Sequence, residues 1–167
     1  SRKPIFVDLS PENVAGFVFW TRFPGNLIKH FDYIDSRYGP THYMNLTITN
    51  YPKLLEPSQL DEPKLCRSID YLVQRYGENY LKWRFDPIII STITPKEWII
   101  ETFYSLCEKL KSRVRTCITS FVDLYPKVAR TFATLYKKHR VQFFDLALEE
   151  KVELVRQLQA IGKSFGI

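Results

Sequence analysis

The stretch Tyr80–Ile90, which has the sequence YLKWRFDPIII, decides the fold class of this chain. Leu81 and Trp83 are apolar, and they share one face of a strand because they are two positions apart. The intervening Lys82 and Arg84 are charged and share the other face, because successive side chains of a β-strand point to opposite sides of its sheet. The stretch therefore predicts a strand that buries one face and presents charges on the other.

Three further segments have strand character and precede or follow this one at regular intervals. The four expected strands begin near residues 14, 43, 80 and 115, so that 29 to 37 residues separate their starts. Such intervals suit repeated strand–helix units with parallel strands. The expected strands are Val14–Trp20, Tyr43–Thr49, Tyr80–Phe85 with its extension Ile88–Ile90, and Arg115–Val122.

Each interval contains a helix start signal followed by apolar residues at helical spacing. A final helix is expected over Leu148–Lys163, where apolar residues recur every three or four positions. The residues expected to cap the other helices at their N-termini are Asn26, Ser58, Thr94 and Asp123.

Parallel strand–helix repeats leave two architectures, an open doubly wound sheet and a barrel. No glycine-rich phosphate loop occurs among the six glycines, which argues against a nucleotide-binding open sheet. We therefore expect an α/β chain in which residues 1–167 form a single partial β/α barrel domain of the TIM-like type. Four strands are too few to close an eight-stranded barrel, so we expect the domain to be truncated at both ends.

The chain carries 24 lysines and arginines against 18 aspartates and glutamates, a net charge of +6. This balance is compatible with a polyanionic partner such as nucleic acid. The dense basic runs are Lys109–Arg115 and Lys137–Arg140. Both lie near expected helix C-termini, where cations complement the helix dipole, so the sequence favours a structural role over a nucleic-acid patch.

Cysteine usage and hydropathy bear on the location of the protein. The chain has an odd number of cysteines, and their spacing fits no metal or redox motif: they are Cys66, Cys107 and Cys117. We therefore expect reduced cysteines in a cytoplasmic protein. No apolar run approaches the roughly 20 residues that span a bilayer, so no membrane partner is expected. The three histidines lie on or beside expected helices without ligand spacing, and no metal ligand is assigned.

Polar side chains also follow one face of the second expected strand, at Asn45, Thr47 and Thr49. Strands buried between helices are usually apolar on both faces. A polar row inside a barrel therefore indicates a cavity that binds a charged molecule, because buried charges are costly unless they are paired. The alternative is an antiparallel sheet with one face in water, which the intervening helices argue against.

The candidate site lies at the carboxyl ends of the strands, where barrel enzymes place their chemistry. Arg84 can hold a carboxylate or phosphate with two hydrogen bonds, and Asp86 can pair with it or act as an acid, base or ligand. A structural ion pair between the two is an equal alternative. Asp123 is a third catalytic candidate, although the sequence favours a helix cap there. The expected binding residues are Thr21, Arg22, Thr47, Thr49, Arg84 and Ser120.

Four strings carry a family resemblance in this order and spacing: Val18–Pro24, Asn45–Thr49, Trp83–Ile88 and Ser120–Tyr125. Together they resemble an uncharacterised prokaryotic family, a domain of unknown function whose members look like radical-SAM enzymes with a cysteine cluster near the C-terminus. The Arg-x-Asp-Pro string at Arg84 is also similar to one in the spore photoproduct lyase group.

The resemblance implies a β/α barrel, an iron–sulfur cluster and S-adenosylmethionine in a full-length parent protein. The implied cysteine cluster would lie beyond Ile167, so no cluster ligand is assigned to the three cysteines of this chain. Arg84, Asp86 and the threonines would hold the charged groups of S-adenosylmethionine, and the cofactor would perform the radical chemistry. The fragment by itself is expected to be inactive.

Three functional hypotheses follow. The first is a fragment of a radical-SAM-like enzyme of unknown substrate, for which nucleic acid is one candidate. The second is a non-redox barrel lyase or hydrolase that uses Arg84 and Asp86 for binding and proton transfer. The third is a non-catalytic basic domain that binds nucleic acid.

Overall fold

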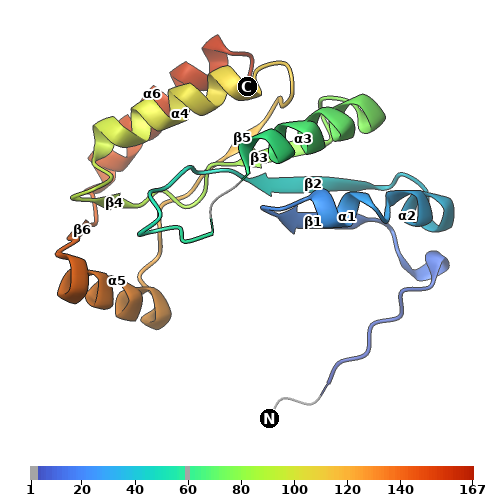
Figure 1. The fold of residues 1–167 in the computed structure, drawn as a ribbon, viewed down its shortest axis with the longest axis horizontal. Helices are drawn as coiled ribbons and strands as arrows, with labels where there is room; N and C mark the ends of the chain where they lie inside the picture. The colour runs from blue at the N-terminus through green and yellow to red at the C-terminus, as the bar shows by residue number, and fades with distance from the viewer. Residues whose placement is uncertain (1–3, 59–60) are drawn as a thin grey trace.

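A sheet of four parallel strands forms the centre of the computed structural model, which describes residues 4–58 and 61–167 (Figure 1). The strands lie side by side in the order in which they occur along the chain, so each successive strand is added at the same edge of the sheet. They form an open sheet with β1 and β5 at its edges, and the expected barrel is not seen as a closed structure. The strands are β1 (Phe17–Thr21), β2 (His42–Thr47), β3 (Leu81–Arg84) and β5 (Cys117–Ile118).

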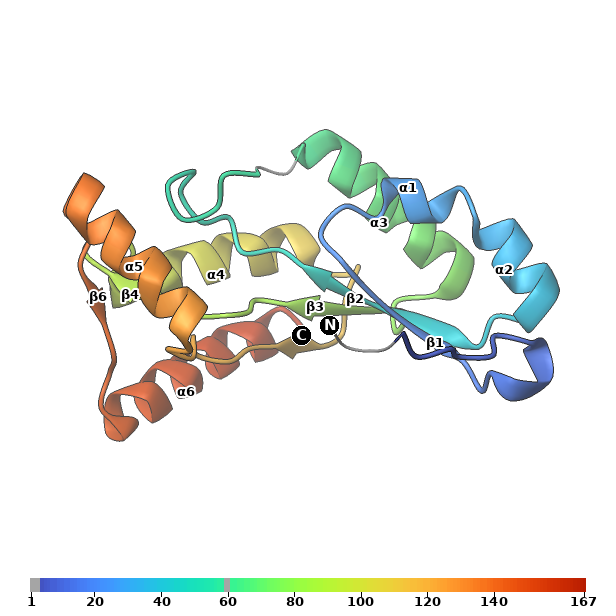
Figure 2. The same cartoon turned by 90° about the horizontal axis from the view of Figure 1, so that it is seen from below.

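Helices connect these strands, and a short antiparallel pair, β4 (Ile90–Ser91) with β6 (Phe143–Phe144), lies beyond their carboxyl ends (Figures 1 and 2). Within the described ranges, no helix has the length and apolar character needed to cross a membrane. The helices are η1 (Pro11–Asn13), α1 (Gly25–Ile28), α2 (Phe31–Tyr38), α3 (Glu62–Tyr76), α4 (Lys96–Leu110), α5 (Pro126–His139) and α6 (Leu148–Ser164).

The third strand is shorter than its sequence suggests. β3 ends at Arg84, and the expected extension over Ile88–Ile90 does not continue it. Pro87 interrupts the ladder because proline has no N–H to donate. Pairing with the fourth strand resumes only as a single bridge between Ile88 and Phe121, and Ile90 belongs to the separate β4–β6 pair.

The expected capping residues are displaced by a few positions. Asp61, not Ser58, caps α3, and its carboxylate accepts a hydrogen bond of 3.1 Å from the backbone N–H of Lys64. The Thr94 hydroxyl donates to the carbonyl of Ile89 instead of capping α4. The N-cap residues of α1, α4 and α5 are Pro24, Pro95 and Tyr125.

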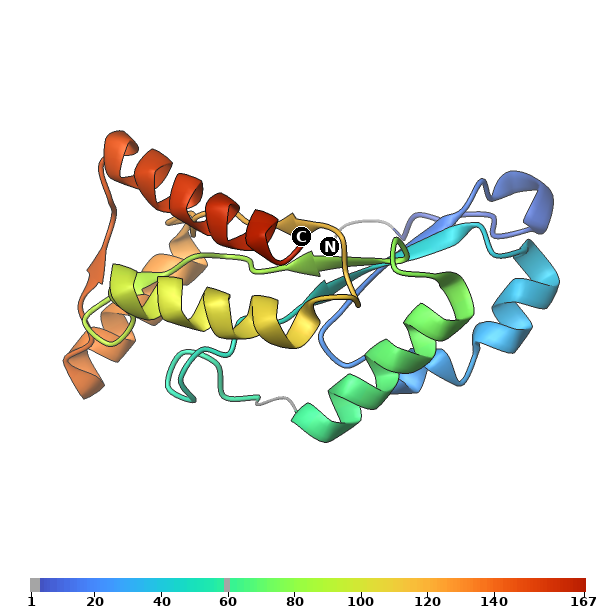
Figure 3. The same ribbon diagram turned by 90° about the horizontal axis from the view of Figure 1, so that it is seen from above.

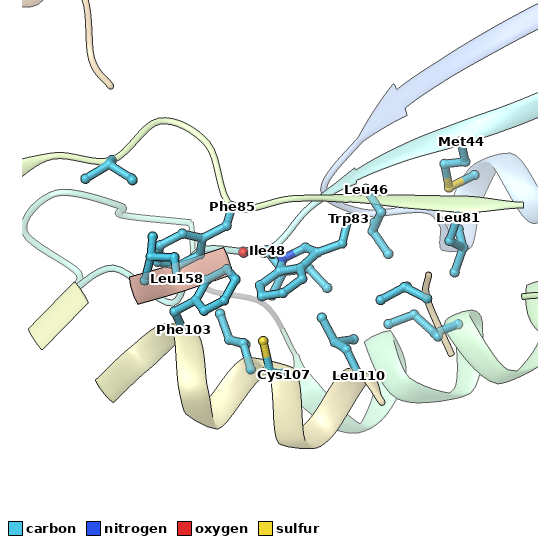
Figure 4. Packing of buried hydrophobic residues seen from close by; sticks show 14 of the residues in the cluster. Met44, Leu46, Ile48, Leu81, Trp83, Phe85, Phe103, Cys107, Leu110 and Leu158 are labelled. Carbon is cyan, nitrogen blue, oxygen red and sulfur yellow. Dashed lines mark hydrogen bonds between the residues drawn. The ribbon is translucent and has the colours of Figure 1, made fainter. Parts of the chain in front are cut away.

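The apolar face of the sheet packs against α3, α4 and α6 (Figures 3 and 4). Trp83 lies at the centre of this layer and stacks on Phe103 of α4 with 5.0 Å between ring centroids. Its indole N–H donates to the carbonyl of Ile48 at 2.9 Å, so the buried ring has no unpaired donor. Other fully buried residues of this layer include Met44, Leu46 and Leu81 of the sheet, Phe85 just after β3, and Ile99 and Cys107 of α4.

At the amino end of the sheet, His42 begins β2 and is enclosed by aromatic rings. It therefore lies in a strand and not on or beside a helix as the sequence suggested. Its Nε2 lies 2.8 Å from a carboxylate oxygen of Asp35, and its Nδ1 lies 2.9 Å from the Tyr80 hydroxyl. A neutral His42 that donates from Nε2 and accepts at Nδ1 satisfies both ring nitrogens.

Asp35 is the centre of this network, because its second oxygen accepts from Tyr76 at 2.7 Å and from Arg75 at 2.6 Å. Partial burial alone would raise the pKa of Asp35, but the hydrogen bonds from His42, Tyr76 and Arg75 outweigh it and hold the pKa below its usual range. A depressed pKa means that Asp35 stabilises the fold above its unfolded pKa of about 3.9. That contribution is lost as the pH falls through the lower, folded pKa.

We predict that Asp35→Asn lowers the free energy of unfolding at pH 7 by about 1–3 kcal/mol, because it removes hydrogen bonds to a charged group. The difference between the two proteins should shrink as the pH is lowered below about 4, because Asp35 of the unfolded wild type binds a proton there and the folded carboxylate follows only at its lower pKa. Urea unfolding at several pH values measures both effects. Asp32→Asn is the matched control, since Asp32 binds the same Arg75 but is 90% exposed; an equal loss in both variants would contradict the prediction.

Candidate functional site

The face of the sheet opposite the core carries polar and aromatic side chains. The register pairs Trp20 with Asn45 and Thr47 with Arg84, so these four side chains lie on neighbouring strands of the same face. Trp20 keeps 62% of its surface exposed, whereas Asn45 beside it is buried. The alternation seen in the sequence thus produces a two-sided sheet with a polar, partly open face.

Arg84 is held at the carboxyl end of β3 by groups from three strands. One terminal nitrogen of its guanidinium lies 2.5 Å from a carboxylate oxygen of Asp86. The second oxygen of Asp86 accepts a hydrogen bond from the hydroxyl of Ser120, which follows β5. The guanidinium also lies over the Trp20 ring of β1, with 4.0 Å to the ring centroid. These contacts join three of the expected site residues, Arg84, Asp86 and Ser120, into one cluster, named here the Arg84 cluster.

A second cluster joins the ends of β1 and β2. Arg22 forms an ion pair with Glu56, which lies in the loop after β2. Thr49 donates its hydroxyl proton to Glu56 with a distance of 3.0 Å, and both Thr49 and Glu56 are buried. Burial lowers the pKa of the Arg22 guanidinium, a direction that disfavours its charged form. The ion pair with Glu56 places the Arg22 guanidinium at the edge of the polar face.

Three buried polar atoms of this face have no hydrogen-bond partner among the described residues: Nε of Arg22, Oδ1 of Asn45 and Nε of Arg84. Leaving such an atom unpaired typically costs about 1–3 kcal/mol. Two of them are donors and one is an acceptor, so together they present complementary hydrogen-bonding groups. Unpaired groups on side chains held rigidly by their other contacts are typical of a surface that binds a ligand.

The remaining expected residues are Thr21, Thr47 and Asp123, and none of the contacts described above involves them. Thr21 has the parity of the core face, and its hydroxyl accepts a hydrogen bond of 3.0 Å from the backbone N–H of Phe23, which is a local turn contact. Thr47 lies on the polar face beside Arg84, to which the register pairs it. Asp123 is exposed in the loop before α5 and does not cap that helix, whose N-cap residue is Tyr125.

Three residues at the site were not among the catalytic and binding residues expected from the sequence: Trp20, Glu56 and Asn45, of which the sequence places Asn45 only in the polar row of the second strand. Trp20 and Asn45 are foreseeable, because the strand alternation places them on the same face as Arg84. Glu56 lies in the proline-rich loop Asn50–Pro57, and no local pattern indicates that this loop returns to Arg22.

A family model matches residues 1–167, the whole of the chain. The chain belongs to DUF1848, a domain of unknown function. No curated protein and no solved structure matches it. The match establishes the family, but the description of the family gives no activity. Any chemistry of this DUF1848 chain therefore has to follow from its own residues.

The three cysteines do not resemble a metal site. Burial raises the pKa of Cys107 to about 12, and the pKa of Cys117 is raised to about 12 as well, again mainly by burial. Thiols with such values are protonated near neutral pH and react slowly as nucleophiles. In the described ranges, no group of three His, Cys, Asp or Glu side chains is placed to hold a metal ion.

We predict that a thiol reagent such as 5,5′-dithiobis(2-nitrobenzoate) labels Cys66 first at pH 8, because the pKa values of the other two thiols, Cys107 and Cys117, are raised mainly by burial. At that pH about one molecule in ten thousand carries a thiolate at a cysteine of pKa about 12, so Cys107 and Cys117 should react only on unfolding. The variant Cys66→Ser should remove the fast phase of labelling. A fast phase that survives in this variant would show that a buried thiol is accessible and contradict the assignment.

Proposed function

We propose that this DUF1848 chain is the ligand-binding wall of a radical-SAM-like enzyme with a parallel β/α barrel, and that it is one part of a longer protein. Two features support the architecture. The strands follow one another in chain order without reversal, as strands in a barrel do, and the helix layer covers the apolar face of the sheet. The polar face would then line the interior of the barrel.

The Arg84 cluster is the observation on which the proposal rests. Arg84 is fixed by Asp86 and Trp20 so that its terminal nitrogen is engaged while Nε stays unpaired. Asn45, on the neighbouring strand, has an unpaired Oδ1. Both unpaired atoms are buried, and the side chains that carry them are a guanidinium that can donate to a carboxylate and an amide that can accept from an ammonium group.

These residues fit the amino-acid end of S-adenosylmethionine, which carries one carboxylate and one ammonium group. Arg84 would hold the carboxylate through a guanidinium N–H that Asp86 does not use, and the Asn45 amide would accept a hydrogen bond from the ammonium group. The exposed Trp20 ring and Thr47 would flank the bound molecule. Bound S-adenosylmethionine would supply the radical chemistry, and the residues of this face would orient it.

An iron–sulfur cluster does not fit the cysteines of this chain. Their spacing fits no cluster motif, and within the described residues they belong to no group of three potential metal ligands. The proposal therefore assigns no cluster ligand here and places any such ligands in another part of the parent protein.

Asp86 is better suited to position Arg84 than to transfer a proton. Both of its carboxylate oxygens already accept hydrogen bonds, one from Arg84 and one from Ser120. A general base needs an oxygen within reach of the substrate proton. The alternative of a non-redox lyase or hydrolase based on Asp86 consequently has less support from the geometry.

We expect S-adenosylmethionine to bind the chain in a saturable, one-to-one manner in equilibrium dialysis. Arg84→Ala and Asn45→Leu should each weaken binding at least tenfold, which corresponds to about 1.4 kcal/mol. Arg67→Ala is the matched control, because Arg67 is an exposed arginine on α3, outside the site, and should leave binding unchanged.

Melting curves of the same variants separate a binding role from a structural one. The proposal requires that Arg84→Ala keep a cooperative transition close to that of the wild type while binding is lost. A fall in melting temperature that parallels the loss of binding would identify Arg84 and Asp86 as a structural ion pair. An absence of S-adenosylmethionine binding to the folded wild-type chain would refute the cofactor assignment.

A further inference from the structure

Nearly all of the net positive charge of the chain lies on one helix. Pro126–Arg140, which comprises α5 and the residue that ends it, contains five lysines and arginines and no aspartate or glutamate. The rest of the chain has the other 19 basic residues against all 18 acidic ones and is almost neutral. The net charge of +6 is therefore a local property of α5 and not a general one of the surface.

The two basic runs of the sequence differ in their surroundings. In the first, Lys109 pairs with Glu62 at 2.8 Å, Arg113 with Asp70 at 2.6 Å and Arg115 with Glu78 at 2.5 Å, so acidic side chains balance three of its four cations. In the second, no ion pair involves the basic residues of α5 within the described part of the chain. The helix-dipole explanation accounts for both runs from the sequence alone, but the contacts distinguish them. The unpaired cations are Lys127, Arg130, Lys137, Lys138 and Arg140.

Four of these cations form a stripe along α5. Lys137 and Lys138 follow Lys127 by ten and eleven positions and Arg130 follows it by three, which returns all four side chains to one side of a helix with 3.6 residues per turn. All four are exposed, and the stripe extends over roughly 16 Å at 1.5 Å per residue. An exposed row of cations of this length can contact several consecutive phosphates of a polyanion.

The opposite side of α5 is attached to the protein and is not free to enter a lipid layer. Phe132 stacks on Phe143 of β6 with 3.6 Å between ring centroids, and Val128 and Leu135 are half-buried. A membrane-bound amphipathic helix inserts its apolar side, and here that side is already occupied. Charge complementarity thus favours a soluble polyanion.

Exposed aromatic rings border the stripe. Tyr125, the N-cap residue of α5, is 56% exposed, and Tyr136 on the next-to-last turn is 52% exposed. Ala129 and Ala133 are exposed and lie between these tyrosines and the basic stripe. Because alanine side chains are short, the helix surface between the two rows projects less than the rows themselves. Single-stranded nucleic acids bind surfaces that combine a basic track for the phosphates with aromatic rings for the bases.

We infer that α5 is a binding surface for single-stranded nucleic acid, with its basic stripe on the phosphates and with Tyr125 and Tyr136 against the bases. The inference does not depend on the ligand proposed for the Arg84 cluster. α5 lies beyond the carboxyl ends of the parallel strands (Figures 1 and 2), so a bound strand would pass close to that edge of the sheet.

The test measures fluorescence anisotropy of a labelled oligothymidine of about 15 nucleotides with the full chain, between roughly 50 and 200 mM salt. The stripe variant carries Lys127→Gln, Arg130→Gln, Lys137→Gln and Lys138→Gln. Its control removes the same number of charges from exposed cations elsewhere, and both proteins have a net charge of +2 instead of +6. The control substitutions are Lys29→Gln, Lys53→Gln, Arg67→Gln and Lys163→Gln.

We expect the wild type and the control to bind with similar affinity, and the logarithm of the association constant to fall with that of the salt concentration with a slope of about −2 to −3. The stripe variant should bind more than tenfold more weakly and lose most of that slope. Equal binding by the stripe variant and its control, or binding of anionic phospholipid vesicles without binding of the oligonucleotide, would overturn the inference.

The double variant Tyr125→Ala, Tyr136→Ala tests the stacking component. It should weaken binding several-fold without a change in salt dependence, because the removed groups are uncharged. The control Tyr33→Ala, Tyr104→Ala alters two exposed tyrosines on α2 and α4 and should have no effect. If the Tyr125 and Tyr136 variant binds normally and a duplex of the same length binds as tightly as the single strand, the single-strand assignment is wrong. Circular dichroism melting of every variant confirms that a loss of binding occurs in folded protein.

Discussion

The stacking of Trp83 on Phe103 links the central strand to the helix layer, and the orientation of the whole sheet depends on it. Because the indole N–H also bonds to the carbonyl of Ile48, the ring is fixed in position as well as buried. A strand shows alternate residues to opposite faces, so burial of Trp83 forces Lys82 and Arg84 outward to the polar face. A shift of the β3 register by one residue would bury Lys82 and Arg84 and expose Trp83. Such a shift is disfavoured because burying an unpaired charge costs on the order of several kcal/mol of free energy.

The polar face shows two ways of holding an arginine near the interior. Arg84 combines a short ion pair to Asp86 with an aromatic contact to Trp20, so that its charge is balanced and its flat surface is covered. Arg22 depends on Glu56, and that carboxylate receives further support from Thr49. Neither Nε has a hydrogen-bond partner among the described residues, and the two arginines lie at the carboxyl ends of β1 and β3, on either side of β2.

The sequence indicates the strands well because polarity alternation is a local signal that survives folding. Arg84 and Asp86 are two residues apart on an extended chain, so their pairing is foreseeable from spacing alone. Arg22 and Glu56 meet only because a loop folds back, and no spacing rule describes that return. Helix starts are harder to predict, since Ser58 and Asp61 are both good capping residues and backbone geometry selects one. The two basic runs look alike in sequence, and only the acidic side chains paired with the first run separate them.

The uneven distribution of charge makes the molecule an electric dipole. With an almost neutral body and a helix of charge +5 at one end, an external field exerts a torque on the molecule as well as an attraction. In the vicinity of a polyanion the molecule would therefore rotate before contact, with α5 leading. Since α5 lies beyond the carboxyl ends of the strands, such pre-orientation would bring that edge of the sheet toward the polyanion and shorten the rotational search that normally limits association.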